Sequence, residues 1–139
     1  MELNVFKILH SELIAFFQCI EHDLKIIYAY MHEGNPNETL RSLSKTNLGA
    51  IIMELELLDN SDNHPYFSKE EYAYLKQIKN IRTYWCHEAY LDFIYDSDRL
   101  NSKAYKNVAI QLQIDHDHLN NVYQNVNNVL NTVMVKFRR

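Results

Sequence analysis

The amino-acid sequence predicts an all-α fold, an up-down bundle of four or five antiparallel helices in a single domain covering residues 1–139. Only two glycines and two prolines occur in the chain, whereas sandwiches, barrels and nucleotide-binding α/β folds need many turn residues. Apolar residues recur at steps of three and four, which is the period of a helix with one buried face. Hydrophobic residues make up 47% of the chain and charged residues 23%, the balance of a globular domain with a full core.

The first predicted helix carries one continuous apolar stripe of about thirty residues. Its members are Leu3, Phe6, Leu9, Leu13, Phe16, Ile20, Leu24, Ile27 and Met31. The stripe stops at Gly34-Asn35-Pro36, a natural helix terminator. The amino-terminal segment is amphipathic and carries acidic residues, unlike a signal peptide, and no apolar run approaches the roughly 18 residues of a membrane span. We therefore expect a soluble, cytoplasmic protein with no membrane partner.

The second predicted helix follows this terminator and has a short apolar inner face. That face consists of Leu48, Ile51 or Ile52, Leu55 and Leu58. Leu40 and Leu43 either start this helix early or belong to a separate short turn. Residues 59–65, with the sequence DNSDNHP, form the most loop-like segment of the chain and end the helix.

Serine caps open the last two predicted helices. Ser68 and Glu71 have the spacing of a capping box, and the apolar register that follows runs towards Tyr95. Its members are Tyr72, Leu75, Ile78, Trp85 and Leu91. After a loop at residues 96–102, Ser102 caps a long helix whose other face is rich in asparagine and is expected to face water. The inner face of this helix consists of Tyr105, Val108, Leu112, Leu119, Val122, Val126, Val129 and Val133.

The charge balance excludes some partners and leaves others open. The formal net charge of −4 argues against a protein that coats nucleic acid nonspecifically or binds a membrane surface. It leaves open an enzyme that acts on RNA at a small basic site. Cys19 and Cys86 lie in apolar helical stretches, so we expect reduced core cysteines and neither a disulfide nor a zinc pair.

Arg82 interrupts the apolar register of the third predicted helix. Ile78 and Cys86 lie one turn to either side of it, and an unpaired charge beside an apolar stripe is costly. Arg82 therefore reaches water, pairs with an acid, or lies in a cleft or a subunit interface. His87 follows five residues later, which separates the two side chains by about 140° around the helix and roughly 7.5 Å along it. Such a pair can flank a common groove or meet a second copy across a dimer axis.

The sequence KNIRTYWCHEAYLDF, residues 79–93, resembles the HEPN superfamily, whose hallmark is R-x4-6-H in the third helix of a small helical bundle. Residues 46–58, TNLGAIIMELELL, resemble the helix that precedes this motif in several HEPN branches. The family usually has Asn, His or Asp directly after the arginine, and this chain has Thr83. The resemblance implies a HEPN-type bundle that acts as a toxin or phage-defence endoribonuclease, with neither metal nor cofactor, at a homodimer interface.

The implied reaction assigns roles to the motif residues. In HEPN ribonucleases the ribose 2′-hydroxyl attacks the adjacent phosphate and leaves a cyclic phosphate and a 5′-hydroxyl. Histidine titrates near neutrality, so His87 takes the acid/base role, and the forked guanidinium of Arg82 takes the phosphate role. Thr83 either hydrogen-bonds the phosphate or orients His87. Lys76 and Lys79 either extend a positive track for the RNA backbone or form a solvated helix face.

The resemblance also implies partners besides RNA, and DNA is not expected among them. Some HEPN toxins carry H-x-Y after the motif, with a tyrosine that a nucleotidyltransferase antitoxin adenylylates. Here the order is His87-Glu88-Ala89-Tyr90, one residue longer, and Tyr90 is the supporting residue nearest to that position. Two aromatic residues precede it, Tyr84 and Trp85, and all three either stack on bases or belong to the core or a dimer interface.

Two other function classes compete with the ribonuclease. The first is a non-catalytic dimeric scaffold or partner-binding protein, in which Arg82 is purely structural. The second is a histidine metal site, because the chain has seven histidines. No histidine follows a glutamate at the third position, and Asp115 with His118 gives only a single D-x-x-H. Such a metal site therefore needs histidines from different helices.

Overall fold

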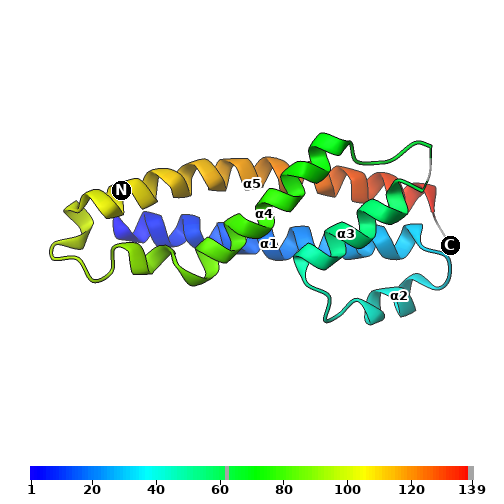
Figure 1. Cartoon of the computed structure of the whole chain (residues 1–139), viewed down its shortest axis with the longest axis horizontal. Helices are drawn as coiled ribbons and strands as arrows, with labels where there is room; N and C mark the ends of the chain where they lie inside the picture. Colours follow the sequence, from blue (N-terminus) through cyan, green and yellow to red (C-terminus); the bar gives the residue numbers. More distant parts are fainter. Residues whose placement is uncertain (62, 138–139) are drawn as a thin grey trace.

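The computed structural model describes residues 1–61 and 63–137, and over these residues the chain is helical with no strand (Figure 1). The all-α prediction is confirmed. The five α-helices are α1 (Leu3–Met31), α2 (Pro36–Ser42), α3 (Leu48–Asp59), α4 (Lys69–His87) and α5 (Lys103–Lys136). Two 3₁₀ turns, η1 (Ala89–Asp92) and η2 (Arg99–Asn101), join α4 to α5.

The two longest helices, α1 and α5, run parallel to each other (Figure 1). The Tyr105 hydroxyl donates to the Met1 carbonyl oxygen, and further along both helices His116 Nε2 lies 2.5 Å from Glu12 Oε2. In an up-down order of five helices the first and the last run the same way, as α1 and α5 do here. The short α2 turns the chain back, so that α3 again runs in the direction of α1 (Figure 1). Only α4 runs against the other long helices.

The helix starts follow the capping residues of the sequence. The Ser68 hydroxyl accepts from the Glu71 N–H at 3.1 Å and the Glu71 carboxylate accepts from the Ser68 N–H, so the predicted capping box is present. The Ser102 hydroxyl accepts from the Tyr105 N–H, as expected for the cap of α5. Leu40 lies in a separate short helix, α2, which decides between the two predicted alternatives. Each side-chain cap contributes on the order of 1 kcal/mol to stability.

A buried carboxylate joins the end of α3 to the start of α4. Asp59 is fully buried and accepts hydrogen bonds from the Tyr66 and Phe67 N–H groups at 2.8 and 3.1 Å. The Tyr72 hydroxyl donates to the same carboxylate at 2.6 Å. Burial, and then this hydrogen bond, raise the pKa of Tyr72 far above its ordinary value. The loop predicted from residue 59 thus begins one residue later, because Asp59 is the last residue of α3 and orients α4 against it.

The third predicted helix ends earlier than its apolar pattern suggests. α4 stops at His87, and Leu91 and Tyr95 are 59% and 85% exposed. The 3₁₀ turn η1 changes the helical phase, so Phe93 becomes buried where its ring packs edge-on against Phe6 at a centroid distance of 5.5 Å. The extension of this helix towards Tyr95 is therefore wrong, since aromatic packing against α1 competes with continued helix.

The two cysteines differ from their prediction. Both Cys19 and Cys86 are free, but both are exposed, so their assignment to the core is wrong. Each lies at the edge of an apolar stripe, where a helical period of 3.6 residues leaves the side chain outside the buried face.

The central helix α1 is the one helix among the described residues that is long and apolar enough to cross a membrane by length and composition. The expectation that no apolar run approaches this length is wrong by that measure. In the bundle α1 packs against each of the other four α-helices, and its buried stripe includes Phe6, Leu13 and Ile20. The central helix of a packed bundle has the same length and composition as a span, so this feature alone does not place α1 in a membrane.

Candidate functional site

The carboxyl-terminal half of α4 presents the motif residues on two sides of the helix. Thr83 and His87 are exposed on the outward face, and His87 is the last residue of the helix. Arg82 lies at the edge of the buried face and points towards α1, where it contacts Glu21. This separation agrees with the angle of about 140° that a five-residue spacing gives in a regular helix.

Arg82 is paired with an acid. Its Nη1 donates to Glu21 Oε1 at 3.4 Å, and the Arg82 side chain is 40% exposed. The other oxygen of Glu21 lies 3.7 Å from the Nζ of Lys25, so one carboxylate serves two cations. Long, half-exposed ion pairs of this kind contribute little to stability, typically less than about 1 kcal/mol. Of the environments expected for Arg82, the structure shows pairing with an acid, Glu21. A more strongly charged anion, such as a phosphate, can replace this carboxylate.

The single chain does not bring Arg82 and His87 into one pocket. Four concavities among the described residues lie elsewhere, and neither residue lines any of them. Thr83 donates its hydroxyl proton to the Lys79 carbonyl oxygen at 3.2 Å, so in this rotamer it can only accept a further hydrogen bond. One copy of the chain thus carries the motif as an open surface.

Tyr90 belongs to an aromatic cluster below that surface. Its ring packs edge-on against His10 and Phe6, with centroid distances of 5.2 and 5.5 Å. Burial raises the pKa of the Tyr90 hydroxyl. The His10 Nε2 lies 2.9 Å from the Trp85 carbonyl oxygen, and since a carbonyl only accepts, this nitrogen carries the proton. The cluster fixes the end of α4 against α1.

Trp85 belongs to the core, so of the two predicted roles, base stacking or packing, it has the packing role. It is 1% exposed, and its indole Nε1 donates to Asp115 Oδ2 at 2.8 Å. Gln111 donates to the other oxygen of the same carboxylate at 2.9 Å. Asp115 was a candidate metal ligand beside His118, but its carboxylate accepts a hydrogen bond from the buried indole of Trp85. Tyr84 is half-buried and donates its hydroxyl to Asp92.

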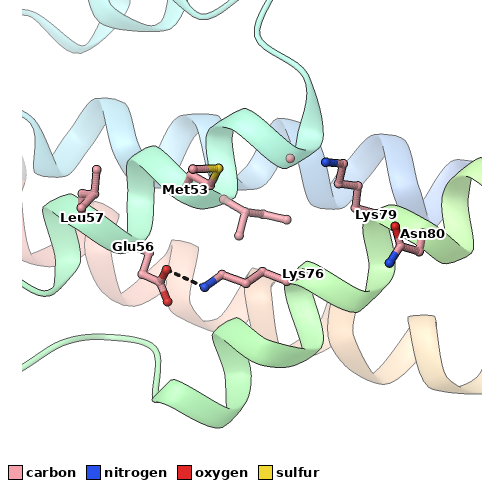
Figure 2. Close-up of a pocket in the computed structure, with 8 residues that line it drawn as sticks. Met53, Glu56, Leu57, Lys76, Lys79 and Asn80 are labelled. Carbon is pink, nitrogen blue, oxygen red and sulfur yellow. Dashed lines mark ion pairs between the residues drawn. The ribbon is translucent and has the colours of Figure 1, made fainter.

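A groove of about 480 Å³ between α3 and α4 contains both candidate RNA-backbone lysines (Figure 2). Lys76 Nζ lies 2.7 Å from Glu56 Oε1, so its charge is already balanced. The Lys79 stem lies across Gly49, where an added Cβ would come within 3.0 Å of Lys79 Cδ. Within the described part of the chain Lys79 makes no ion pair, and its ammonium remains available to a ligand. Two exposed apolar residues, Met53 and Leu57, complete the groove.

The histidines do not converge on a metal site. Among the described residues, no group of three or more His, Cys, Asp or Glu side chains is arranged to hold a metal ion. His116 pairs with Glu12 and packs against Phe16, whereas His118 packs against Tyr74 on α4. The geometry thus gives no support to the histidine metal site.

Comparison with known proteins adds no assignment, since no family model, curated protein or solved structure matches this chain. The function is therefore inferred from the residues and geometry of α4 and its neighbours. Sequence reasoning missed Glu21 and Lys25, which contact Arg82 directly or through one carboxylate. The only signal for them is their i, i+4 spacing on α1, which does not indicate a third partner from another helix.

Proposed function

We propose that this protein is a HEPN-like, metal-independent endoribonuclease of toxin or phage-defence type, acting in the cytoplasm. The observation that carries the proposal is the arrangement of three residues on α4. His87 and Thr83 are exposed on the outward face, and the partly exposed Arg82 lies at its edge. Because helical geometry keeps Arg82 and His87 apart in one chain, the proposed site combines Arg82 of one copy with His87 of a second copy in a homodimer.

The proposed reaction uses only groups that these side chains supply. His87 accepts the proton of the ribose 2′-hydroxyl, and that oxygen attacks the adjacent phosphorus. The P–O5′ bond breaks, which leaves a 2′,3′-cyclic phosphate, and the departing 5′-oxygen becomes a hydroxyl by taking a proton from the protonated His87 or from water. Arg82 exchanges Glu21 for the phosphate, whose developing negative charge a forked guanidinium stabilises better than an ammonium does.

One observation favours a second candidate, a non-catalytic dimeric scaffold. Arg82 already has an acidic partner in Glu21, and the neighbouring groove exposes Met53 and Leu57, which suit protein contacts. In either case a nucleotidyltransferase-type antitoxin acting on Tyr90 is a further proposal. It requires η1 to open first, because the ring of Tyr90 packs against His10 and Phe6.

A cleavage assay distinguishes the two candidates. Total RNA and transfer RNA are incubated with the purified protein in EDTA, and wild type is compared with Arg82→Ala and His87→Ala. The ribonuclease proposal expects cutting by wild type and a loss of at least about a hundredfold in each variant. His64→Ala and Arg99→Ala, at exposed positions outside α4, are the matched controls and should cut like wild type. No cutting by a folded wild-type dimer would favour the scaffold.

A further inference from the structure

A second concavity, of about 500 Å³, is lined by residues of α1, of α2 and of the segment after α2. Figure 1 shows α2 beside the carboxyl-terminal part of α1. The concavity is lined by His22, Lys25, Asn37, Leu40, Arg41 and Ser44. These side chains include two permanent cations, a titratable imidazole and two neutral hydrogen-bonding groups, and none is acidic. Such a combination of permanent cations and neutral donors suits a phosphate group.

Lys25 is the most unusual member of this set, because it is a lysine that is only 8% exposed. Its one ion pair among the described residues is with Glu21 Oε2 at 3.7 Å, which is beyond hydrogen-bond distance. An ammonium has three N–H donors, and Glu21 lies too far from Lys25 Nζ to accept from any of them. Anionic oxygens in the concavity can accept hydrogen bonds from these donors.

Arg41, Asn37 and Ser44 add further groups of the concavity that can bind an anion. Arg41 lies exposed in the last turn of α2 and makes no ion pair within the described part of the chain. A guanidinium in this position can bind two oxygens of one phosphate. Asn37 and Ser44 add an amide and a hydroxyl as neutral donors. His22 lies 3.9 Å from Asp23, so its imidazole already has a nearby carboxylate.

The negative net charge of the chain means that any anion bound in this concavity is held by the local cations. With a net charge of −4, the protein as a whole repels anions, so binding here must come from the local cations. The same Glu21 carboxylate that faces Lys25 also pairs with Arg82 on α4. The concavity is therefore connected to the candidate site through one shared acidic residue.

We infer that the concavity between α1 and α2 binds the phosphate group of a nucleotide or of an RNA strand, with Lys25 and Arg41 as its cations. Binding requires neither His87 nor cleavage. The inference and the proposed function can therefore fail separately.

Titration of the full-length protein with inorganic phosphate, followed by calorimetry or by amide chemical shifts, tests the inference. Arg41→Gln should weaken phosphate binding about tenfold, because it removes a charge-assisted hydrogen bond from an exposed residue that the fold does not need. Arg99→Gln makes the same change of charge in η2, at the opposite end of the molecule (Figure 1), and should leave the affinity unchanged. Equal affinity in wild type and Arg41→Gln would overturn the inference, as would equal weakening in both variants.

Two competitors identify the source of the phosphate. Displacement of inorganic phosphate by adenosine monophosphate alone would indicate a nucleotide phosphomonoester. Displacement by a single-stranded ribo-oligonucleotide without terminal phosphates would indicate the diester backbone of RNA. Failure of both competitors would contradict a phosphate site of either kind. Lys25→Gln, provided that it folds, should weaken binding at least as much as Arg41→Gln, because it removes the buried cation.

Discussion

Two carboxylates that contact α4, Asp59 and Glu21, show how differently the same group is used. Asp59 is fully buried and accepts three hydrogen bonds of 2.6–3.1 Å from two backbone N–H groups and the Tyr72 hydroxyl. Glu21 is half-buried and lies 3.4 and 3.7 Å from its cations, Arg82 and Lys25. The Asp59 carboxylate thus accepts three short hydrogen bonds, whereas the Glu21 carboxylate makes two long ion pairs with different cations.

The two carboxylates therefore have different roles, one in stability and the other in the proposed function. The hydrogen-bond capacity of Asp59 is used by groups that cannot leave without unfolding the turn between α3 and α4. The cations of Glu21 are held weakly enough for an incoming phosphate to take them. We therefore expect the Asp59 cluster to stabilise the fold and the surface around Glu21 to bind ligands.

The largest expected effect is on the Asp59 cluster. Asp59→Ala leaves two buried backbone N–H groups and a buried hydroxyl without acceptors, and we expect a loss of about 3 kcal/mol or more in the free energy of unfolding. Urea denaturation of wild type and variant measures this loss. Asp96→Ala removes an exposed carboxylate and should change the same free energy by less than about 0.5 kcal/mol. Similar losses for the two variants would contradict a stabilising role of the Asp59 cluster.

A smaller change is expected at Glu21, and mainly in binding. Glu21→Gln removes the negative charge shared by Arg82 and Lys25, so the free energy of unfolding should change by less than about 1 kcal/mol. The affinity for inorganic phosphate should rise about threefold, because the anion no longer competes with a carboxylate. Calorimetric titration beside the urea experiment measures both quantities. A destabilisation comparable to that of Asp59→Ala would show that Glu21 is structural.

The smallest expected effect concerns Asp23, which lies between the two extremes. It is 9% exposed, and burial raises its pKa above the ordinary value of 3.8 despite opposing contributions from Asn127 and His22. A carboxyl with a raised pKa in the folded state binds more protons there than in the unfolded state. Its contribution to stability is therefore lost as pH rises from about 3.8 through the raised value.

Asp23→Asn does not ionise and should escape this loss. The free energy of unfolding of the variant, measured in urea at a series of pH values from about 4 to 7, should rise relative to wild type as pH increases. A difference that stays constant or falls with pH would contradict the proposed effect of burial on Asp23.

Local sequence patterns predicted the features that depend on neighbouring residues. The stripe of α1, the caps Ser68 and Ser102 and the inner face of α5 all follow from spacings of three or four residues. The exposed and edge positions of His87 and Arg82 also follow from helical geometry.

The remaining features depend on contacts between distant residues. The end of α4 at His87 reflects packing of Phe93 against Phe6. Asp115 accepts a hydrogen bond from Trp85, thirty residues away in the sequence, and Glu21 accepts one from Arg82 on another helix. No local period encodes such pairs, so the partners of the candidate site could not be predicted.

A mixing experiment tests the central claim most directly. Cleavage of RNA in EDTA is measured for wild type, for Arg82→Ala, for His87→Ala, and for an equimolar mixture of the two variants after subunit exchange. We predict activity in wild type, none in either variant, and partial recovery in the mixture, because a mixed dimer contains one intact Arg82 facing one intact His87. No cleavage by wild type, or no recovery in a mixture that forms mixed dimers, would contradict a ribonuclease site shared between two copies of this chain.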